Sequence, residues 1–327
     1  MDIFSPVSSL ADTITYTGLG IVKGSYLGDA VNFFIYDTIK IGLLLLVINY
    51  LMAITRYYFP MEKVRDILTE RRWFGLDYLF AALLGVVTPF CSCSSIPLFI
   101  GFVGAGIPLG VTFAFLISSP LINEASLYLF PAMFGMRVTV IYNLVGIGVA
   151  IVGGMVIQKL KMERFIKTDL LKFKSRQQVE SEYGGSSIPF KKLVSYWWKD
   201  GILITRQVFP YVVLGVAIGA LIHGFVPASL VEKYLSNRSW WTVPLATLLG
   251  APLYANSVGV IPVMEALVGK GVPIGTALAF MTAIVTLSIP EGLILKKVMH
   301  WQLLIAFFGI TTFGIILMGY LLNSGFV

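Results

Sequence analysis

The chain has 327 residues, of which 57% are hydrophobic and 13% are charged, and its mean hydropathy is +0.85. A soluble domain has about a quarter of its residues charged, so these values exclude an ordinary soluble protein. The formal net charge of +7 does not indicate a nucleic-acid partner, because ten of the 24 Lys and Arg residues lie between Lys159 and Lys199. Such a cluster is typical of a cytoplasmic loop that follows the positive-inside rule.

The apolar residues come in windows of about 20, the length that crosses a bilayer as a helix. We therefore expect an all-α integral membrane protein with about eight to ten transmembrane helices. Residues 1–30 contain no compact apolar stretch, so no cleavable signal peptide is expected. The ten candidate spans are 33–55, 74–91, 95–106, 108–131, 137–159, 202–223, 241–256, 260–269, 273–295 and 301–323.

The spans divide into two homologous halves, 1–159 and 201–327, joined by a basic cytoplasmic linker at 160–200. The third and eighth spans are too short to cross alone and are expected to be half-helices or re-entrant segments. If both cross, each half has five spans and the repeats are inverted; if neither crosses, a parallel four-plus-four arrangement results. With the linker inside, 17 basic residues lie in inside segments and five in outside segments. This bias favours the inverted repeat.

Two stretches of the chain repeat each other. Residues 81–117 align without a gap onto residues 246–282, at a constant offset of 165. Duplicated hydrophobic segments interrupted by Gly and Pro at matching places are typical of the binding region of a secondary transporter. The identical pairs include Gly85/Gly250, Ser92/Ser257, Pro97/Pro262, Gly106/Gly271, Pro108/Pro273 and Gly110/Gly275.

The first copy contains two cysteines, Cys91 and Cys93, between Pro89 and Pro97. Because proline removes a backbone donor and clashes with the preceding turn, we expect a helix break at these prolines and no regular helix between them. Irregular backbone at membrane depth is tolerated where it lines a cavity, and thiolates suit thiophilic species such as copper(I), zinc or trivalent arsenic. Close helix packing by small residues is the alternative. The candidate substrate-binding residues here are Cys91, Ser92, Cys93, Ser94 and Ser95.

The second copy has no thiols. Its helix-breaking prolines are Pro252 and Pro262, and Asn256 aligns with Cys91. We expect Asn256 and Ser257 to complete an asymmetric site, which would suit a small substrate with one soft end.

Two glutamates lie deep in apolar spans, Glu124 and Glu291. A carboxyl group inside a membrane is costly unless it is protonated, paired or facing a water cavity. Both residues are therefore candidates for proton coupling, with a structural hydrogen bond as the alternative interpretation. The sequence contains no Walker A motif or catalytic triad, and we expect no enzymatic activity, cofactor or resident metal.

The segment from Pro89 to Pro97, followed by Gly104-x-Gly106-x-Pro108-x-Gly110, resembles the predicted-permease family that includes the organoarsenical exporter ArsP and the YraQ-type permeases. The resemblance implies an inner-membrane permease and, for the ArsP branch, export of trivalent organoarsenicals with cysteine thiols binding arsenic. Cys91 and Cys93 occupy that motif. The chain departs from the family at Ser288-Ile289-Pro290-Glu291, where many members have a Pro/Asn-containing stretch.

The leading hypothesis is a secondary transporter that moves a small thiophilic solute outward, most simply a trivalent arsenical or a similar metalloid. A permease for a sulfur-containing anion or a metal ion is the second. A membrane thiol–disulfide relay is the third, although the chain has no other cysteine to pass electrons on. The expected partners are a small-molecule or metalloid substrate, membrane lipid and a second copy in a homo-oligomer.

Overall fold

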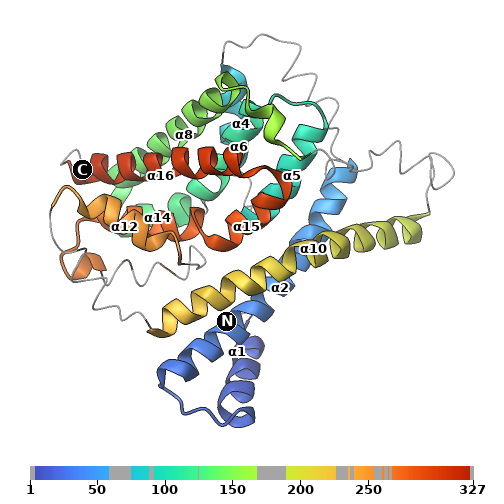
Figure 1. The fold of residues 1–327 in the computed structure, drawn as a ribbon, viewed down its shortest axis with the longest axis vertical. Helices are drawn as coiled ribbons and strands as arrows, with labels where there is room; N and C mark the ends of the chain where they lie inside the picture. Colours follow the sequence, from blue (N-terminus) through green and yellow to red (C-terminus); the bar gives the residue numbers. More distant parts are fainter. Residues whose placement is uncertain are drawn as a thin grey trace. The chain divides into compact units, whose positions relative to one another are not determined.

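The computed structural model describes residues 4–58, 75–87, 92–123, 125–167, 189–225, 235, 239–253, 260, 264 and 267–324. These residues form helices, and the one β-feature among them is an isolated bridge. The expected all-α fold is confirmed. The named elements (Figure 1) are α1 (Ser5–Asp12), η1 (Thr13–Gly18), α2 (Tyr26–Tyr58), α4 (Leu76–Val87), α5 (Ser92–Gly104), α6 (Leu109–Leu121), η2 (Ala125–Leu129), α7 (Phe130–Met133), α8 (Gly135–Lys159), η3 (Met162–Phe165), α10 (Phe190–Phe225), α12 (Thr242–Gly250), α14 (Ile274–Thr286), α15 (Ile289–Val298) and α16 (Trp301–Asn323).

Several of these helices have the length and composition of membrane spans. Tyr26–Leu51, Gly135–Lys159 and Trp301–Asn323 qualify individually, and the number rises to five if each of two bent helix pairs is counted as one span. Named helices occupy nine of the ten expected positions, whereas 260–269 lies largely outside the described residues. The described residues therefore support three to five spans.

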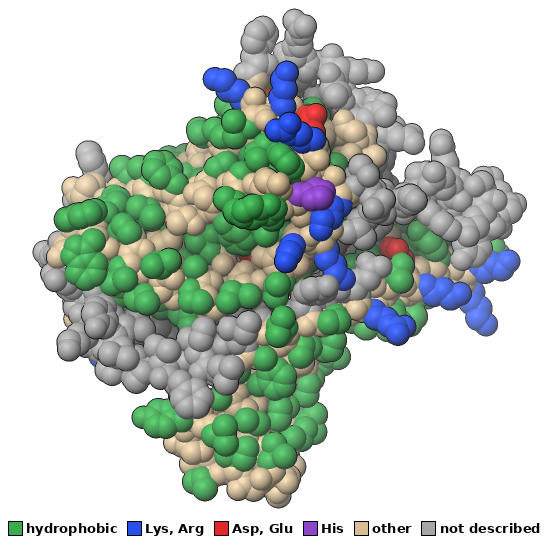
Figure 2. All heavy atoms as spheres, viewed as in Figure 1, with side chains coloured by type: hydrophobic (Ala, Val, Ile, Leu, Met, Phe, Trp, Pro, Cys, Tyr) green, Lys and Arg blue, Asp and Glu red, His purple; other side chains and the backbone are tan. Residues whose placement is uncertain are grey.

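The long helices present apolar side chains outward. Leu144 and Val152 on α8 are 63% and 59% exposed, and Phe313 on α16 is 69% exposed. Figure 2 shows hydrophobic side chains over much of the visible face, with Lys and Arg side chains gathered in a few places. Exposed apolar surface on this scale indicates an interaction with a membrane or another protein, and here it agrees with the span lengths.

The chain forms two compact units. One comprises Met1–Leu44, Phe209–Leu293 and Thr312–Val327, and the other comprises Leu45–Val208 and Ile294–Thr311. Each unit takes segments from both halves of the sequence. The helices α4, α6 and α8 lie in the second of these units, and α12, α14 and the C-terminal part of α16 lie in the first, so each unit contains the packed core of one repeat.

The duplication in the sequence is a duplication of backbone geometry. Gly106 and Gly271 have φ angles of 84° and 90°, a conformation that glycine adopts without strain. The bonds Ile107 N–H to Phe102 O and Gly106 N–H to Val103 O form a Schellman motif, and the same pair recurs 165 residues later. Pro108 and Pro273 then turn the chain with ψ of 137° and 138°, and each begins a helix of 13 residues, α6 or α14.

Glycines bring the next helices into backbone contact. A Cβ on Gly110 of α6 would lie 2.5 Å from the carbonyl oxygen of Gly154 on α8, and a Cβ on Gly275 of α14 would lie 2.1 Å from that of Gly319 on α16. At each contact, the N–H of the first glycine donates a hydrogen bond to a side-chain amide oxygen of the neighbouring helix. The Gln158 Oε1 accepts from the Gly110 N–H at 2.8 Å, and the Asn323 Oδ1 accepts from the Gly275 N–H at 2.9 Å. We call these two arrangements, Gly110–Gly154–Gln158 and Gly275–Gly319–Asn323, the glycine clamps. Each one caps the start of a helix that has no side-chain cap of its own.

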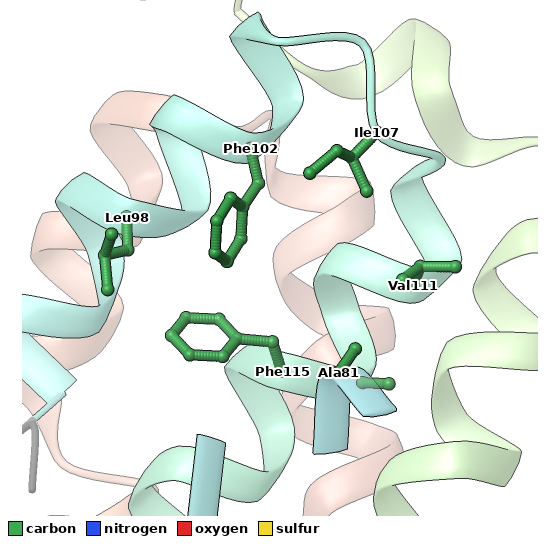
Figure 3. Packing of buried hydrophobic residues seen from close by; sticks show 7 residues of the cluster. Ala81, Leu98, Phe102, Ile107, Val111 and Phe115 are labelled. Carbon is green, nitrogen blue, oxygen red and sulfur yellow. The ribbon is translucent and has the colours of Figure 1, made fainter. Parts of the chain in front are cut away.

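An apolar cluster fills the space between α4, α5 and α6. Figure 3 shows Leu98 and Phe102 of α5 facing Phe115 and Val111 of α6. The Phe102 and Phe115 rings meet edge to face, with centroids 5.2 Å apart. Aromatic pairs in this arrangement contribute about 0.5–1.5 kcal/mol beyond the burial of their surface. The cluster therefore fixes α5, which carries the cysteine-containing segment, against the repeat core. Its buried members are Ala81, Leu98, Phe102, Ile107, Val111, Ala114 and Phe115.

The helices α2 and α10 pack side by side and antiparallel. The Asn49 side chain donates to the Thr205 hydroxyl at 3.0 Å, and further along α2 the ring of Tyr57 meets that of Trp197, with centroids 5.9 Å apart. Residue numbers therefore rise along α2 as they fall along α10. Trp197 is 3% exposed and anchors a cluster with Ala53 and Leu193.

The beginning of the expected linker is folded. Ile166 forms an antiparallel bridge with Met299, and the Lys167 N–H donates to the Val298 carbonyl at 2.9 Å. The end of the expected linker, from Phe190, belongs to α10. Both described ends of the 160–200 segment are therefore folded, and 168–188 lies outside the described residues.

Candidate functional site

The two repeats are broken at the same place. The helix α6 ends at Leu121 and meets the segment Ser126–Met133 at a bend of 58°, while α14 ends at Thr286 and meets Glu291–Val298 at 48°. The candidate spans expected at 108–131 and 273–295 therefore each contain a bend. The first helix contains Pro120 in its last turn, where the missing N–H weakens continuation. In the second, Pro290 is accommodated in the first turn of α15.

Side chains fill the first break. The Tyr142 hydroxyl donates to the Leu121 carbonyl at 2.9 Å, which satisfies an oxygen at the end of α6. The Ser126 N–H donates to the Asn123 Oδ1, and the Ser126 hydroxyl donates to the Asn123 carbonyl and the Asn143 Oδ1 at 2.7 and 3.1 Å. The Asn143 amide also donates to the Thr139 carbonyl at 2.8 Å. The described polar groups around this break thus pair with one another, and Glu124 lies outside the described residues.

The second break contains buried polar residues with a different pattern. Ser288 and Glu291 are each 1% exposed. Ser288 directly precedes α15, and the spacing of Ser288 and Glu291 is that of a capping box, in which the serine hydroxyl accepts from the N–H of the residue three positions later. No described residue hydrogen-bonds to the Ser288 hydroxyl, so the box is not formed.

The cysteine-containing segment is helical from Ser92 onward. The helix α5 runs from Ser92 to Gly104 and passes through Pro97, so the expectation of irregular backbone up to that proline is corrected. Because Pro97 has no N–H, the carbonyl of Cys93, one turn earlier, cannot receive the usual helical bond. Because α5 begins at Ser92, Cys93 lies in its first turn. This N-terminal end of the helix carries the partial positive charge of the macrodipole.

One residue of the segment is tied to the broken helix. Ser95 and Ser119 are buried, and their hydroxyl oxygens lie 2.6 Å apart. Ser119 immediately precedes Pro120 in the last turn of α6. The structure thus brings the start of the cysteine-bearing helix next to the first break, which was not expected from the sequence.

The other candidate residues are placed as follows. Pro252 lies just after the end of α12 at Gly250, as expected for a helix-ending residue. The helix position of Ser94 is described, but its side chain is not. The candidates Pro89, Cys91, Glu124, Asn256, Ser257 and Pro262 lie outside the described residues, and their roles stay predictions.

Several polar residues at the breaks and clamps escaped the sequence reasoning. Tyr142 and Asn143 resemble ordinary polar positions in a span, and nothing in the sequence links them to a break. The clamp amides could have been found, because Gln158 and Asn323 lie 165 residues apart, the repeat offset, and follow Gly154 and Gly319 by four residues.

Among the described residues, no group of three or more His, Cys, Asp or Glu side chains could hold a metal ion.

Comparison with known proteins places this architecture in a family. The UPF0718 protein MJ0584 of Methanocaldococcus jannaschii is 23% identical, and the match covers 75% of this chain and 81% of that protein. The UPF0718 protein YcgR of Bacillus subtilis is 30% identical over a match that covers 36% of this chain and 41% of its own length. No solved structure matches the chain.

A family model described as a predicted permease, ArsP_1, matches residues 26–324. The matched region includes both repeats, both breaks and the cysteine-containing segment. With its apolar helices, this identifies the chain as a multi-pass membrane protein and favours transport over catalysis. The chain belongs to the ArsP_1 family of predicted permeases.

Proposed function

We propose that the chain is a secondary transporter of the cytoplasmic membrane that exports a small thiophilic solute, most simply a trivalent arsenical or a similar metalloid. Cys91 and Cys93 are its reversible ligands, assisted by Ser92, Ser94 and Ser95, with Asn256 and Ser257 from the second repeat. Glu124 and Glu291 couple export to a cation gradient, a proton in the simplest case.

The observation that carries the proposal is the attachment of the thiol-bearing helix to a broken helix. Ser95 meets Ser119 at 2.6 Å, one residue before Pro120. Broken helices in matching places of two repeats are where transporters bind substrates and ions. Cysteine thiols are soft ligands, and their occurrence in the segment that leads into this helix favours a thiophilic solute over a hard cation such as Mg²⁺.

The cysteines are tested by changing both to serine. Cells of an arsenic-sensitive host carry the wild type, Cys91→Ser/Cys93→Ser or an empty vector, and are challenged with trivalent methylated arsenic. We expect the wild type to lower cellular arsenic and the double variant to accumulate as much as the vector control, because a hydroxyl cannot replace a thiolate as a soft ligand.

Membrane amounts of the two proteins are compared by fluorescence-detected size exclusion, which serves as the control for folding. Export by the double variant at the wild-type level would contradict the thiol ligands. Equal accumulation in all three strains despite good expression would contradict the arsenical substrate.

A sulfur-containing anion is the second candidate substrate. The N-terminal end of α5, a 13-residue helix beginning at Ser92, favours negative charge. For this substrate the serine hydroxyls act as donors, and a single Cys91→Ser change is expected to have a mild effect. The same strains, tested for uptake or release of sulfur compounds, distinguish the two substrates.

We further propose that the repeats are inverted, as the charge distribution predicts. The first repeat begins with α2 and the second begins with α10. These two helices pack antiparallel through Asn49–Thr205 and Tyr57–Trp197. Inverted repeats require their first helices to cross in opposite directions, whereas parallel repeats require the same direction. The antiparallel packing therefore supports inversion.

Reporter fusions test the topology. Green fluorescent protein, which is fluorescent only in the cytoplasm, and alkaline phosphatase, active only outside, are placed in the 168–188 segment and after residue 327. We expect fluorescence from the 168–188 insertion and phosphatase activity from the C-terminal fusion. Fluorescence at both positions would establish the parallel four-plus-four alternative instead.

A further inference from the structure

The two breaks differ in how their polar groups are satisfied. In the first, Tyr142 donates to the last carbonyl of α6, and Asn143 pairs with Ser126. In the alignment of the two repeats at an offset of 165, Phe307 and Phe308 of α16 correspond to Tyr142 and Asn143 of α8. Neither phenylalanine has a side-chain donor. The donors that pair at the first break are therefore not repeated at these two aligned positions.

The second break leaves a buried hydroxyl oxygen without a partner. Ser288 is 1% exposed, and no described residue hydrogen-bonds to its Oγ. Burying a hydroxyl without a hydrogen bond costs about 1–3 kcal/mol, and native structures rarely leave such a group unmatched. A bound ligand or water is the physical explanation.

The chemistry of the break indicates a small monovalent cation. The last carbonyls of a helix have no intrahelical partners, and this end of α14 carries the negative end of its macrodipole. One hydroxyl oxygen from Ser288, one carboxylate from Glu291 and these carbonyls form a set of hard oxygen donors, which suits hard cations. A single carboxylate balances one positive charge. The N-terminal turn of α15, which contains Glu291, stabilises the ionised carboxylate.

We propose that the break between α14 and α15 is a binding site for a small alkali cation, with Na⁺ held by the Ser288 hydroxyl, the Glu291 carboxylate and the terminal carbonyls of α14. The site rests on the proposed function, because it specifies the coupling ion of the transporter. A proton on Glu291 is the competing occupant.

Thermal unfolding of the purified full-length protein in detergent tests the site without any substrate. NaCl is replaced stepwise by KCl or choline chloride at constant ionic strength, and tryptophan fluorescence reports the midpoint. A cation that binds only the folded state raises this midpoint with concentration. We expect Na⁺ to stabilise the wild type more than choline does.

Three variants locate the effect. Ser288→Ala should raise the Na⁺ concentration for half-maximal stabilisation about tenfold, equivalent to about 1.4 kcal/mol, and Glu291→Gln should abolish the Na⁺ response. Ser126→Ala, the matched change at the first break, should lower the midpoint but keep the Na⁺ response. Identical curves for Na⁺, K⁺ and choline in the wild type, or a wild-type Na⁺ response in Ser288→Ala, would overturn the site and leave water or a proton as its occupant.

The outcome is independent of the arsenical experiment. A specific Na⁺ response with no arsenic export removes the proposed substrate and keeps the ion site. Arsenic export without any Na⁺ response removes the ion site and keeps the thiol-dependent transporter.

Discussion

Replacing Gly154 by alanine is expected to disrupt the packing of α6 on α8. The new Cβ would lie 2.4 Å from the carbonyl oxygen of Gly110, whereas ordinary van der Waals contact begins at 3.4 Å. Because the opposing atom belongs to the backbone of a helix, no side-chain rotation relieves the clash, and the helices must move apart. Overpacking of this kind costs about 3 kcal/mol, and the hydrogen bond from the Gly110 N–H to Gln158 is lost with it.

The same helix supplies a matched control. A Cβ on Gly148 would meet no atom within 4 Å, so Gly148→Ala should leave the protein as stable as the wild type or more stable, because alanine favours helix by about 1 kcal/mol. The measurement is the thermal midpoint and the monodisperse fraction of a fluorescent fusion after detergent extraction. In the second repeat, Gly275→Ala is the equivalent change, because its Cβ would lie 2.1 Å from the carbonyl oxygen of Gly319, and Gly309→Ala, whose Cβ would meet no atom within 4 Å, is its control. Equal midpoints within either pair would show that the helices are not in backbone contact.

Trp197→Ala is expected to be the other strongly destabilising change. Trp197 is 3% exposed and packs edge to face with Tyr57 and Phe190, at centroid distances of 5.9 and 6.3 Å. Truncating a buried Trp typically costs about 3–5 kcal/mol, through lost burial and the cavity left behind. The change removes the largest side chain between α2 and α10, so we expect a steep loss of thermal stability.

The adjacent tryptophan is the control for this substitution. Trp198 is 47% exposed and has one ring contact, with Tyr50 at 5.8 Å. Trp198→Ala should therefore cost much less, and the difference between the two thermal midpoints measures the buried contact. If Trp198→Ala lowers the midpoint as much as Trp197→Ala, the antiparallel packing of α2 on α10 is not the one described, and the support it gives to inverted repeats is lost.

The repeat could be predicted from the sequence because its geometry depends on residue types that stand out. Gly106 and Gly271 are glycines because both adopt positive φ at the end of a Schellman motif. Pro108 and Pro273 are prolines because both hold the extended conformation that precedes α6 and α14. Glycine and proline have narrow physical roles, so their spacing transfers directly to the fold.

The position of the breaks could not be predicted in the same way. The prolines at 89 and 97 suggested breaks around the cysteines, and those at 252 and 262 suggested breaks at the matching place in the second copy, but α5 passes through Pro97. The break at the end of α6 involves a tertiary hydrogen bond, from the Tyr142 hydroxyl to the Leu121 carbonyl, between residues 21 positions apart. Hydropathy windows are insensitive to such bonds.

The glycine clamps have a mechanical consequence. Where two helices touch through their backbones and an amide closes the contact, no layer of side chains is available to slide or repack, and such contacts are stiff. We therefore expect α6 with α8, and α14 with α16, to move as rigid pairs. Conformational change in a protein built this way is concentrated at hinges, where a few residues absorb the rotation. We expect the bends after Leu121 and Thr286 to be those hinges, and hydroxyl and amide hydrogen bonds hold the first one in place. The rotation of a transport cycle would then occur at the second bend, after Thr286.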